Sequence, residues 1–324
     1  MKKALITGIS GQDGSYLAEF LLAKGYEVHG IVRRQALEDP AGKLSKISQI
    51  RDEVFLHVAS LESHLSLYKV ISAVKPDECY HLAASSFVSY SFDDESSILS
   101  SNFNGTHYLL ASIKEIVPEC RFFFAGSSEM FGLVDNAPQN EFTPFNPRSV
   151  YGISKLASYH LVQNYRNQYD IFACTGILYN HESPRRDFKF VTRKITSAVA
   201  KIKLGLEEKL YLGSLEPLRD WGYAPDYIYA MWLMLQKSTP QNYVIASGIN
   251  HSVRDFVECA FNYVGLNYQE FVELDPRFYR PAEATPLRGD SSKIQQELNW
   301  KNNKQFTDIV AEMVANDLQL FSKE

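Results

Sequence analysis

Two side chains capable of acid–base chemistry lie four residues apart in the segment Tyr151-Gly152-Ile153-Ser154-Lys155. Residues at this spacing share one face of a helix. A tyrosine phenol ordinarily has a pKa of about 10, and a nearby ammonium group stabilises its phenolate. The pair could therefore accept a substrate hydroxyl proton while hydride leaves the same carbon. Alone, the spacing is a weak indication, because such pairs are common on helices.

A serine and a glutamate follow a predicted strand in Ser127-Ser128-Glu129. A serine at the carboxyl end of a parallel strand faces the usual ligand crevice, where it could hydrogen-bond the oxygen being oxidised. Oxidation of an alcohol needs no second base, but elimination does, because the new ketone makes the neighbouring C–H acidic. Glu129 could take that proton and later protonate the departing hydroxyl. Taken alone, it could equally be a surface carboxylate at a helix start.

A glycine-rich turn follows the first predicted strand, in Thr7-Gly8-Ile9-Ser10-Gly11-Gln12-Asp13-Gly14. Glycines permit a tight turn and let the backbone approach a pyrophosphate, which then lies at the positive end of the next helix. The residues expected to hold a dinucleotide here are Gly8, Ser10, Gly11, Gln12, Asp13 and Gly14.

The second predicted strand ends at Val32-Arg33-Arg34, without an acidic residue to bind a ribose 2′-hydroxyl. An arginine at this point can instead meet a 2′-phosphate. Arg33 and Arg34 therefore favour NADP over NAD, the alternative being that both are solvated surface charges.

Length and charge restrict the classes of partner. The 324 residues exceed the usual size of one hydrophobic core and predict about two domains. With 33 Lys and Arg against 38 Asp and Glu, the net charge of −5 excludes a bulk basic field for nucleic acid or an anionic membrane. An anionic ligand must be held by backbone amides and locally placed cations.

Cysteine usage and hydropathy indicate the compartment. The four cysteines are far apart and form no CxxC pair, which argues against a zinc site or a disulfide framework and favours free thiols in a reducing cytosol. The first apolar run ends at Gly8 and no stretch approaches about 18 apolar residues, so neither a signal peptide nor a membrane helix is predicted. We expect a cytoplasmic protein without a metal site.

The elements that must position these residues alternate between strand and helix. Predicted strands lie at 4–7, 27–32, 54–58, 78–82, 121–125 and 172–178, and predicted helices at 15–24, 63–74, 98–115 and 151–168. Such alternation implies βαβ units and a parallel sheet. Beyond Tyr179 we expect loops at 180–187 and 214–226, a strand at 243–246, and helices at 228–236, 253–263, 292–298 and 306–321.

These elements predict an α/β fold with a Rossmann-type doubly wound parallel sheet and a smaller, interleaved C-terminal α/β substrate domain. We expect residues 1–178 plus about 220–248 to form the NADP-binding domain. The second domain would comprise about 179–219 plus 249–324.

Taken together, these segments resemble the extended short-chain dehydrogenase/reductases, and within them the GDP-mannose 4,6-dehydratase family. The glycine motif and the Tyr/Lys pair are shared across the superfamily, whereas segments 180–186, 219–224 and 280–283 are more specific to this branch. The resemblance runs nearly end to end and is carried by residues 6–19, 127–129, 143–151, 155, 178–186, 190–195, 219–224, 251–254, 280–283 and 289–290.

The resemblance implies a role for each matching residue. Tyr151 would be the base for oxidation, with Lys155 also holding the nicotinamide ribose, and Ser127 and Glu129 would complete the catalytic set. Further cofactor contacts would be Ser60, Leu61, Leu82, Ala83 and Ala84. Nucleotide-sugar contacts would be Ser85, Ser86, Ser128, Asn180, Lys194, Arg219, Arg280 and Glu283, in which arginines suit a diphosphate and the carboxylate suits guanine or ribose. Self-association would use the helices near 98–115 and 150–168.

Four segments depart from the family pattern. Ala59-Ser60-Leu61 replaces Gly-Asp-Leu near the adenine, and Gln35–Pro40 replaces a Ser/Asn/Arg-rich loop that reaches a neighbouring subunit. Ala83–Phe87 replaces Ala-Ala-Gln-Ser-His, and Arg288 stands where an apolar residue is common. These changes could mark a different sugar.

The implied activity is dehydration of a GDP-hexose, GDP-mannose first, to the GDP-4-keto-6-deoxy sugar. It would proceed by C4 oxidation, elimination of water across C5 and C6, and hydride return to C6. Alternatives are a dehydratase of a GDP-manno-heptose, and a GDP-sugar 4-reductase or epimerase, which would need Tyr151 and Lys155 but not Glu129. A nucleotide-sensing Rossmann protein without turnover is a third possibility, against which the complete catalytic set argues.

Overall fold

The computed structural model describes residues 1–85, 94–278 and 287–323. Its centre is a seven-stranded sheet with the strand order β10-β6-β5-β4-β1-β2-β3, in which all neighbouring strands are parallel. This confirms the predicted doubly wound sheet. The strands are β1 (Lys3–Thr7), β2 (Glu27–Val32), β3 (Phe55–Val58), β4 (Glu78–His81), β5 (Arg121–Ser127), β6 (Ala173–Leu178) and β10 (Tyr243–Ile245).

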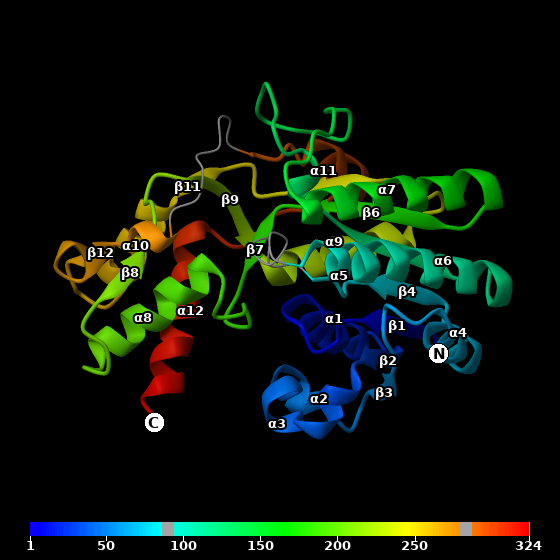
Figure 1. The fold of residues 1–324 in the computed structure, drawn as a ribbon, viewed down its shortest axis with the longest axis horizontal. Helices are drawn as coiled ribbons and strands as arrows, with labels where there is room; N and C mark the ends of the chain where they lie inside the picture. The colour runs from blue at the N-terminus through cyan, green and yellow to red at the C-terminus, as the bar shows by residue number, and fades with distance from the viewer. Residues whose placement is uncertain (86–93, 279–286, 324) are drawn as a thin grey trace.

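Both faces of this sheet are covered by helices (Figure 1). Side chains alternate between the faces, so that Ala4 and Ile6 of β1 pack in one core while Leu5 packs in the other. The first core contains α1 (Gln12–Ala23), α9 (Ala224–Gln236) and α11 (Ser292–Leu298). The second contains α4 (His64–Val74), α6 (Gly105–Ile116) and α7 (Val150–Tyr169).

Several short elements connect these helices to the sheet. After β2 come α2 (Arg34–Glu38), α3 (Pro40–Lys43) and the 3-10 helix η1 (Ser45–Ile50). Helix α5 (Glu95–Leu99) runs through one π-helical turn, η3 (Ser100–Asn104), into α6. The 3-10 turn η4 (Ser128–Met130) follows β5 directly.

A second, smaller unit has its own hydrophobic core. It packs α8 (Val191–Lys203), α10 (Val253–Tyr263) and α12 (Phe306–Phe321) around β8 (Leu210–Leu212). The strand β12 (Val272–Leu274) pairs with β8, flanked by the 3-10 turns η5 (Tyr268–Glu270) and η6 (Pro276–Phe278). Between the two units lies a sheet of order β11-β9-β7, made of β7 (Asn180–Glu182), β9 (Leu218–Tyr223) and β11 (Asn250–Ser252) (Figure 1).

The structure differs from the sequence predictions at four places. The predicted loops at 180–187 and 214–226 contain strands β7 and β9, and residues 34–50 form short helices. Helix α8 was not predicted, because its β-branched residues lower intrinsic helix propensity. Its burial against α10 and α12 overrides that preference. The short strands give no periodic pattern, since they form only by pairing with distant segments.

In the part of the chain that the structure describes, no helix combines the length and apolar character that crossing a membrane requires.

Candidate active site

The glycine-rich turn between β1 and α1 forms an open cradle of backbone. Gly8 has a positive φ of 75°, and the amide of Gly11 donates to the carbonyl of Gly8 at 2.9 Å. A Cβ at Gly14 would lie 2.2 Å from the Gly8 oxygen, so only glycine permits this approach of the helix to the turn. Helix α1 begins without a side-chain cap, which leaves its first amides for an anion. The backbone therefore fits a pyrophosphate.

The ends of β1 and β4 are tied together beside this turn. The Thr7 hydroxyl accepts the amides of Leu82 and Ala83 at 3.1 and 3.0 Å and contacts the Nδ1 atom of His81 at 2.8 Å. A Cβ at Gly8 would lie 3.0 Å from the Ala83 backbone. The predicted cofactor residues of the two strands thus meet at one sheet edge.

The other predicted cofactor residues lie after β2 and β3. Arg33 and Arg34 are exposed at the start of α2. Ser60 is held by Ser66, whose hydroxyl accepts the Ser60 amide at 3.1 Å, and the side chain of Leu61 packs closely on Gly105. These residues are the ones that would face the adenosine end of a dinucleotide.

The predicted catalytic side chains come from two elements that approach closely. Ser149 caps α7 by accepting the Gly152 amide at 3.0 Å, and this fixes the first turn, which carries Tyr151. A Cβ at Gly152 would lie 2.6 Å from the carbonyl oxygen of Glu129. Glycine at this position therefore lets α7 lie directly against η4, the turn after β5.

Tyr151 is buried at this junction and is hydrogen-bonded to Ser127. The pKa of its phenol is raised to about 12, mainly by burial and also by the nearby Glu129 carboxylate, while Ser127 and the Arg186 charge act in the opposite direction. The structure thus brings Ser127, Glu129 and Tyr151 together. Since burial favours the neutral phenol, phenolate formation needs an added positive charge.

Lys155 lies one helical turn further along α7 and is also buried. Its Nζ atom donates to the carbonyl of Ala125 at 2.7 Å and lies 5.9 Å from the centroid of the Tyr151 ring. Burial lowers the pKa of its ammonium to about 7, while the charge of Asp13 opposes this shift. The ammonium can therefore gain and lose its proton near neutral pH.

A buried polar network behind α7 was not predicted from the sequence. Asn102, in the π-helical turn, accepts the Ser85 amide at 2.9 Å through Oδ1 and donates to the Ser154 hydroxyl at 3.0 Å through Nδ2. Ser154 in turn donates to the carbonyl of Tyr151 at 2.7 Å. The sequence shows Asn102 only as a small polar residue within a helical pattern. Its partners Ser85 and Ser154 are 17 and 52 residues away along the chain.

The predicted nucleotide-sugar residues are more dispersed. Asn180 and Arg219 lie half-buried on the neighbouring strands β7 and β9, and Arg219 donates to the carbonyl of Leu218 at 2.7 Å. The Lys194 Nζ lies 3.7 Å from the centre of the Phe278 ring, and burial lowers its pKa. Ser128 is buried in η4. Ser86, Arg280 and Glu283 lie outside the described residues.

Two predicted cofactor residues have side chains that are bonded to another segment of the chain. Gln12 and Asp13 bond to His181 in β7 and to Ser183 just beyond it. Their side chains therefore join the phosphate turn to the segment that carries Asn180.

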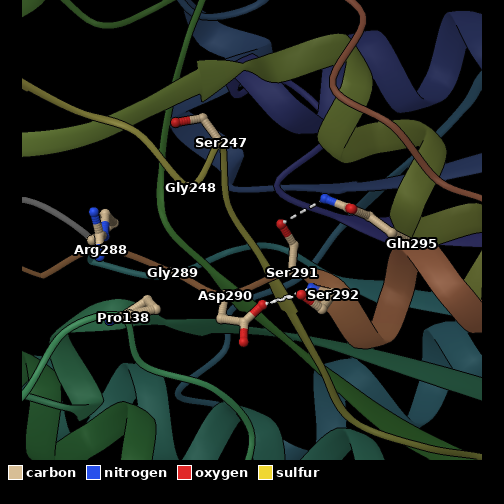
Figure 2. Close-up of a pocket in the computed structure, with 9 residues that line it drawn as sticks. All are labelled: Pro138, Ser247, Gly248, Arg288, Gly289, Asp290, Ser291, Ser292 and Gln295. Carbon is tan, nitrogen blue, oxygen red and sulfur yellow. Dashed lines mark hydrogen bonds between the residues drawn. The ribbon is translucent and has the colours of Figure 1, made fainter.

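A separate hollow of about 260 Å³ lies over the C-terminal part of the chain (Figure 2). Beside it, buried Asp220 accepts the amides of Ser247, Gly248 and Gly289 at 2.8, 2.9 and 3.1 Å. These bonds fix the strand β9 that carries Arg219. The lining residues include none of the predicted site residues; they are Pro138, Ser247, Gly248, Arg288, Gly289, Asp290, Ser291, Ser292 and Gln295.

Among residues 1–85, 94–278 and 287–323, the cysteines are separate thiols and the potential metal ligands form no cluster. In these ranges no group of three His, Cys, Asp or Glu side chains could hold a metal ion. All four cysteines are free thiols, and burial raises the pKa of each.

Comparison with known proteins agrees with this geometry. A family model described as GDP-mannose 4,6 dehydratase matches residues 5–313. GDP-mannose 4,6 dehydratase 2 of Arabidopsis thaliana is 47% identical over 335 residues, which cover 100% of this chain and 88% of the plant protein. GDP-mannose 4,6 dehydratase of Cricetulus griseus is 47% identical over 343 residues, covering 98% of this chain and 92% of its own length.

Solved structures share the fold at lower identity. The dTDP-glucose 4,6-dehydratase of Bacillus anthracis, in complex with NAD, has a TM-score of 0.85 at 20% identity and covers 100% of this chain and 97% of its own. RMD of Pseudomonas aeruginosa, complexed with NADPH, has a TM-score of 0.83 at 22% identity, covering 99% and 100%. Identities this low show the fold alone.

Proposed function

Since the chain belongs to the GDP-mannose 4,6-dehydratase family, we propose that Ser127, Glu129, Tyr151 and Lys155 carry out the reaction of that family. The enzyme is a hydro-lyase that removes water from GDP-mannose and leaves the GDP-linked 4-keto-6-deoxy sugar. The observation that supports the assignment is the close contact of α7 at Gly152 with the backbone carbonyl of Glu129 in η4, together with the effect of the Glu129 charge on the Tyr151 phenol.

Oxidation at C4 begins with removal of the hydroxyl proton. Tyr151 takes this proton as its phenolate, while the Ser127 hydroxyl donates to the C4 oxygen and holds it in place. The Lys155 ammonium supplies the positive charge that the buried phenolate needs. Accepting hydride from C4 and returning it to C6 is the chemistry that a nicotinamide cofactor supplies when bound.

Elimination uses the second base. Once C4 is a ketone, the C5 proton is acidic and Glu129 removes it. The carboxylic acid so formed protonates the C6 hydroxyl, which leaves as water. Because the carboxylate loses its proton again in this step, Glu129 ends the reaction in its starting state. When hydride returns to C6, C5 must regain a proton, and the proton that Tyr151 took from the C4 hydroxyl balances this, so that Tyr151 also ends as the phenolate.

The cofactor is NADP in this proposal. Its pyrophosphate would lie on the amides of residues 8–14, and Ala83, Ala84, Ser60 and Leu61 would line the adenosine. Arg33 and Arg34, exposed beyond β2, would meet the 2′-phosphate. Titration with NADP⁺ and NAD⁺ in parallel tests this, and tighter binding of NAD⁺ would contradict it.

The GDP-sugar would lie across the junction of the two units. Asn180, Lys194 and Arg219 would hold the diphosphate and sugar from one side, and Ser85 and Ser128 would bond the sugar from the other. Arg280 and Glu283, outside the described residues, complete the set that the family resemblance implies.

We further propose a two-part chain, with residues 1–178 plus about 220–248 binding the cofactor and 179–219 plus 249–324 binding the nucleotide sugar. The separate hydrophobic core around α8, α10 and α12 supports this division.

The free cysteines favour a cytoplasmic location.

Two copies would pair through the helices α5–α6 and α7. A shallow hollow there is lined by Leu99, Phe103 and Ala157, and Leu99 and Ile153 are 41% and 48% exposed. Sedimentation at several concentrations tests the pairing, and replacing Ile153 by Asp should dissociate it. A monomer at all concentrations would contradict it.

The activity is tested by incubating the protein with GDP-mannose and NADP⁺ and reading the nucleotide sugar by mass spectrometry. The expected product has lost one water, without net consumption of cofactor. Stoichiometric oxidation of NADPH would instead identify a reductase. A panel of GDP-sugars, including a manno-heptose, decides the sugar, and no water loss with any of them would overturn the proposal.

A further inference from the structure

The first turn of α1 carries a carboxylate where an anion is expected to bind. Asp13 is the second residue of the helix whose amides face the phosphate cradle. A negative charge there repels a pyrophosphate unless it is compensated. The Asp13 Oδ2 lies 2.9 Å from the Nε2 of His181, and Gln12 donates to Oδ1 at 3.0 Å.

The hydrogen bonds of His181 define its charge. Its Nδ1 lies 2.7 Å from the carbonyl oxygen of Tyr179, which can only accept, so Nδ1 carries a proton. Its Nε2 faces the Asp13 carboxylate, which also only accepts. Both ring nitrogens therefore donate, and His181 is an imidazolium. Its ring is buried and stacks on Tyr227 at 4.5 Å.

A second set of bonds joins the same two segments. The Gln12 amide nitrogen donates to the carbonyl of His181 at 3.1 Å, and Ser183 donates to the Gln12 side-chain oxygen at 2.8 Å. Residues 12 and 13 are thus bound to both ends of segment 181–183. Asn180 precedes this segment directly, so these bonds fix the position of the cradle relative to the proposed sugar site.

We propose that Asp13 and His181 form a positioning pair, in which His181 cancels the charge of Asp13 at the phosphate cradle and fixes the cradle against the sugar-binding segment. The inference rests on the proposed function for its kinetic consequences, but its effect on anion binding does not. Neither residue needs to touch the reacting atoms, since both act through the cradle and through the field at the catalytic side chains.

The charge of Asp13 also affects the pKa values of the proposed catalytic groups. Asp13 raises the pKa values of both Tyr151 and Lys155. The other groups that face them are Glu129 from η4, Arg186 from the turn after β7, and His81 from β4, whose pKa burial lowers to about 3 so that it is neutral. Removing the charge of Asp13 should therefore lower both pKa values together.

The chain offers a matched control for these effects. Arg185 donates to Glu19 at 2.6 Å, so this pair also joins α1 to the turn after β7. Both side chains are partly exposed, at 23% and 32%, so that solvent screens their charges. Glu19→Gln removes an ion pair between the same elements without changing the charge at the cradle.

The test measures NADP⁺ binding by calorimetry for wild type, Asp13→Asn, His181→Gln, the double variant and Glu19→Gln. His181→Gln leaves Asp13 uncompensated and should weaken NADP⁺ binding about tenfold. The double variant removes both charges and should recover most of that loss. Asp13→Asn should bind at least as tightly as wild type, and Glu19→Gln should differ by less than about twofold.

A pH profile of turnover with GDP-mannose provides a second measurement. Asp13→Asn keeps a hydrogen-bond acceptor for His181, and its profile should move to lower pH by about half a unit or more. Glu19→Gln should leave the profile in place. This comparison stands even where His181→Gln is unstable.

The proposal is overturned if the double variant binds NADP⁺ no better than His181→Gln, or if Asp13→Asn has the wild-type pH profile. An inactive wild type would overturn the proposed function instead, because the order of NADP⁺ affinities needs no turnover.

Discussion

The proposed catalytic side chains and the proposed nucleotide-sugar contacts are held in different ways. Ser127 ends β5 and Glu129 lies in the turn η4 directly after it. Tyr151 and Lys155 come from one helix, α7, which contacts η4 at Gly152. By contrast, the proposed sugar contacts Asn180, Arg219 and Lys194 come from three separate elements, β7, β9 and α8.

Tyr151 and Lys155 also differ in burial from three of the proposed sugar contacts. Tyr151 and Lys155 are 8% and 3% exposed, whereas Asn180, Lys194 and Arg219 are only half-buried. Buried charges interact strongly, and half-exposed ones are screened by solvent. Changes in the catalytic region should therefore act on kcat and on folding, and changes in the sugar region should act mainly on KM.

The largest effect is expected for Glu129→Gln. The amide keeps the shape of the side chain but cannot take the C5 proton, so water loss should fall about a thousandfold. Partial reduction of NADP⁺ should survive, because Tyr151 and Lys155 are intact. Mass spectrometry measures the product, and near-ultraviolet absorbance measures the reduced cofactor. Glu119→Gln, on an exposed residue after α6, is the control. Unchanged product formation would exclude the assigned role.

Gly152→Ala tests the contact between the two catalytic elements. The added methyl group would lie 2.6 Å from the backbone carbonyl oxygen of Glu129, so α7 or η4 must shift. We expect a loss of about 2 kcal/mol in the free energy of unfolding and a lower kcat, both measurable by denaturation and steady-state assay. Asn167→Ala, exposed on the same helix, should show neither change. A fully active Gly152→Ala enzyme would show that the contact is dispensable.

In the sugar region, Arg219→Ala should raise KM for GDP-mannose about tenfold, the usual contribution of one charge-assisted hydrogen bond. The expected change in kcat is less than about threefold. Arg254→Ala is the control, because Arg254 lies in the same unit and pairs with Glu216. A loss confined to kcat would contradict the division between the two regions.

The smallest effect concerns the contribution of Lys155 to the stability of the protein. Its pKa is lowered to about 7 by burial, so between pH 7 and its unfolded value of about 10.4 the unfolded chain binds more protons and stability rises with pH. Lys155→Met removes this dependence but leaves the carbonyl of Ala125 unpaired. We expect the folded variant to be about 1 kcal/mol more stable than wild type at pH 6.

That advantage should shrink as the pH rises toward 10, as measured by urea denaturation across this range. A variant less stable than wild type at every pH would mean that the lost hydrogen bond to Ala125 outweighs the burial of charge. Lys237→Met, which breaks a partly exposed pair with Glu297, provides the reference.

The same division explains what the sequence could predict. The cradle at Gly8–Gly14 and the Tyr151/Lys155 pair are local patterns, and the structure places them where strand–turn–helix geometry requires. Asn102 could not be identified, because its partners Ser85 and Ser154 are brought to it only by packing of distant helices. Likewise Asp13 was expected to face the cofactor, and only the fold reveals His181 as its partner.

The order of strands in the central sheet has a consequence for synthesis of the chain. Strand β6 ends at Leu178, but its outer neighbour β10 ends only at Ile245, and helix α9, which covers one face, lies between them in sequence. At the ribosome's rate this interval lasts roughly 3 to 13 seconds. During that time the nascent chain exposes an open strand edge and an uncovered apolar face, a combination that invites aggregation. Chaperone occupancy during translation should therefore peak while residues 178–245 are being made.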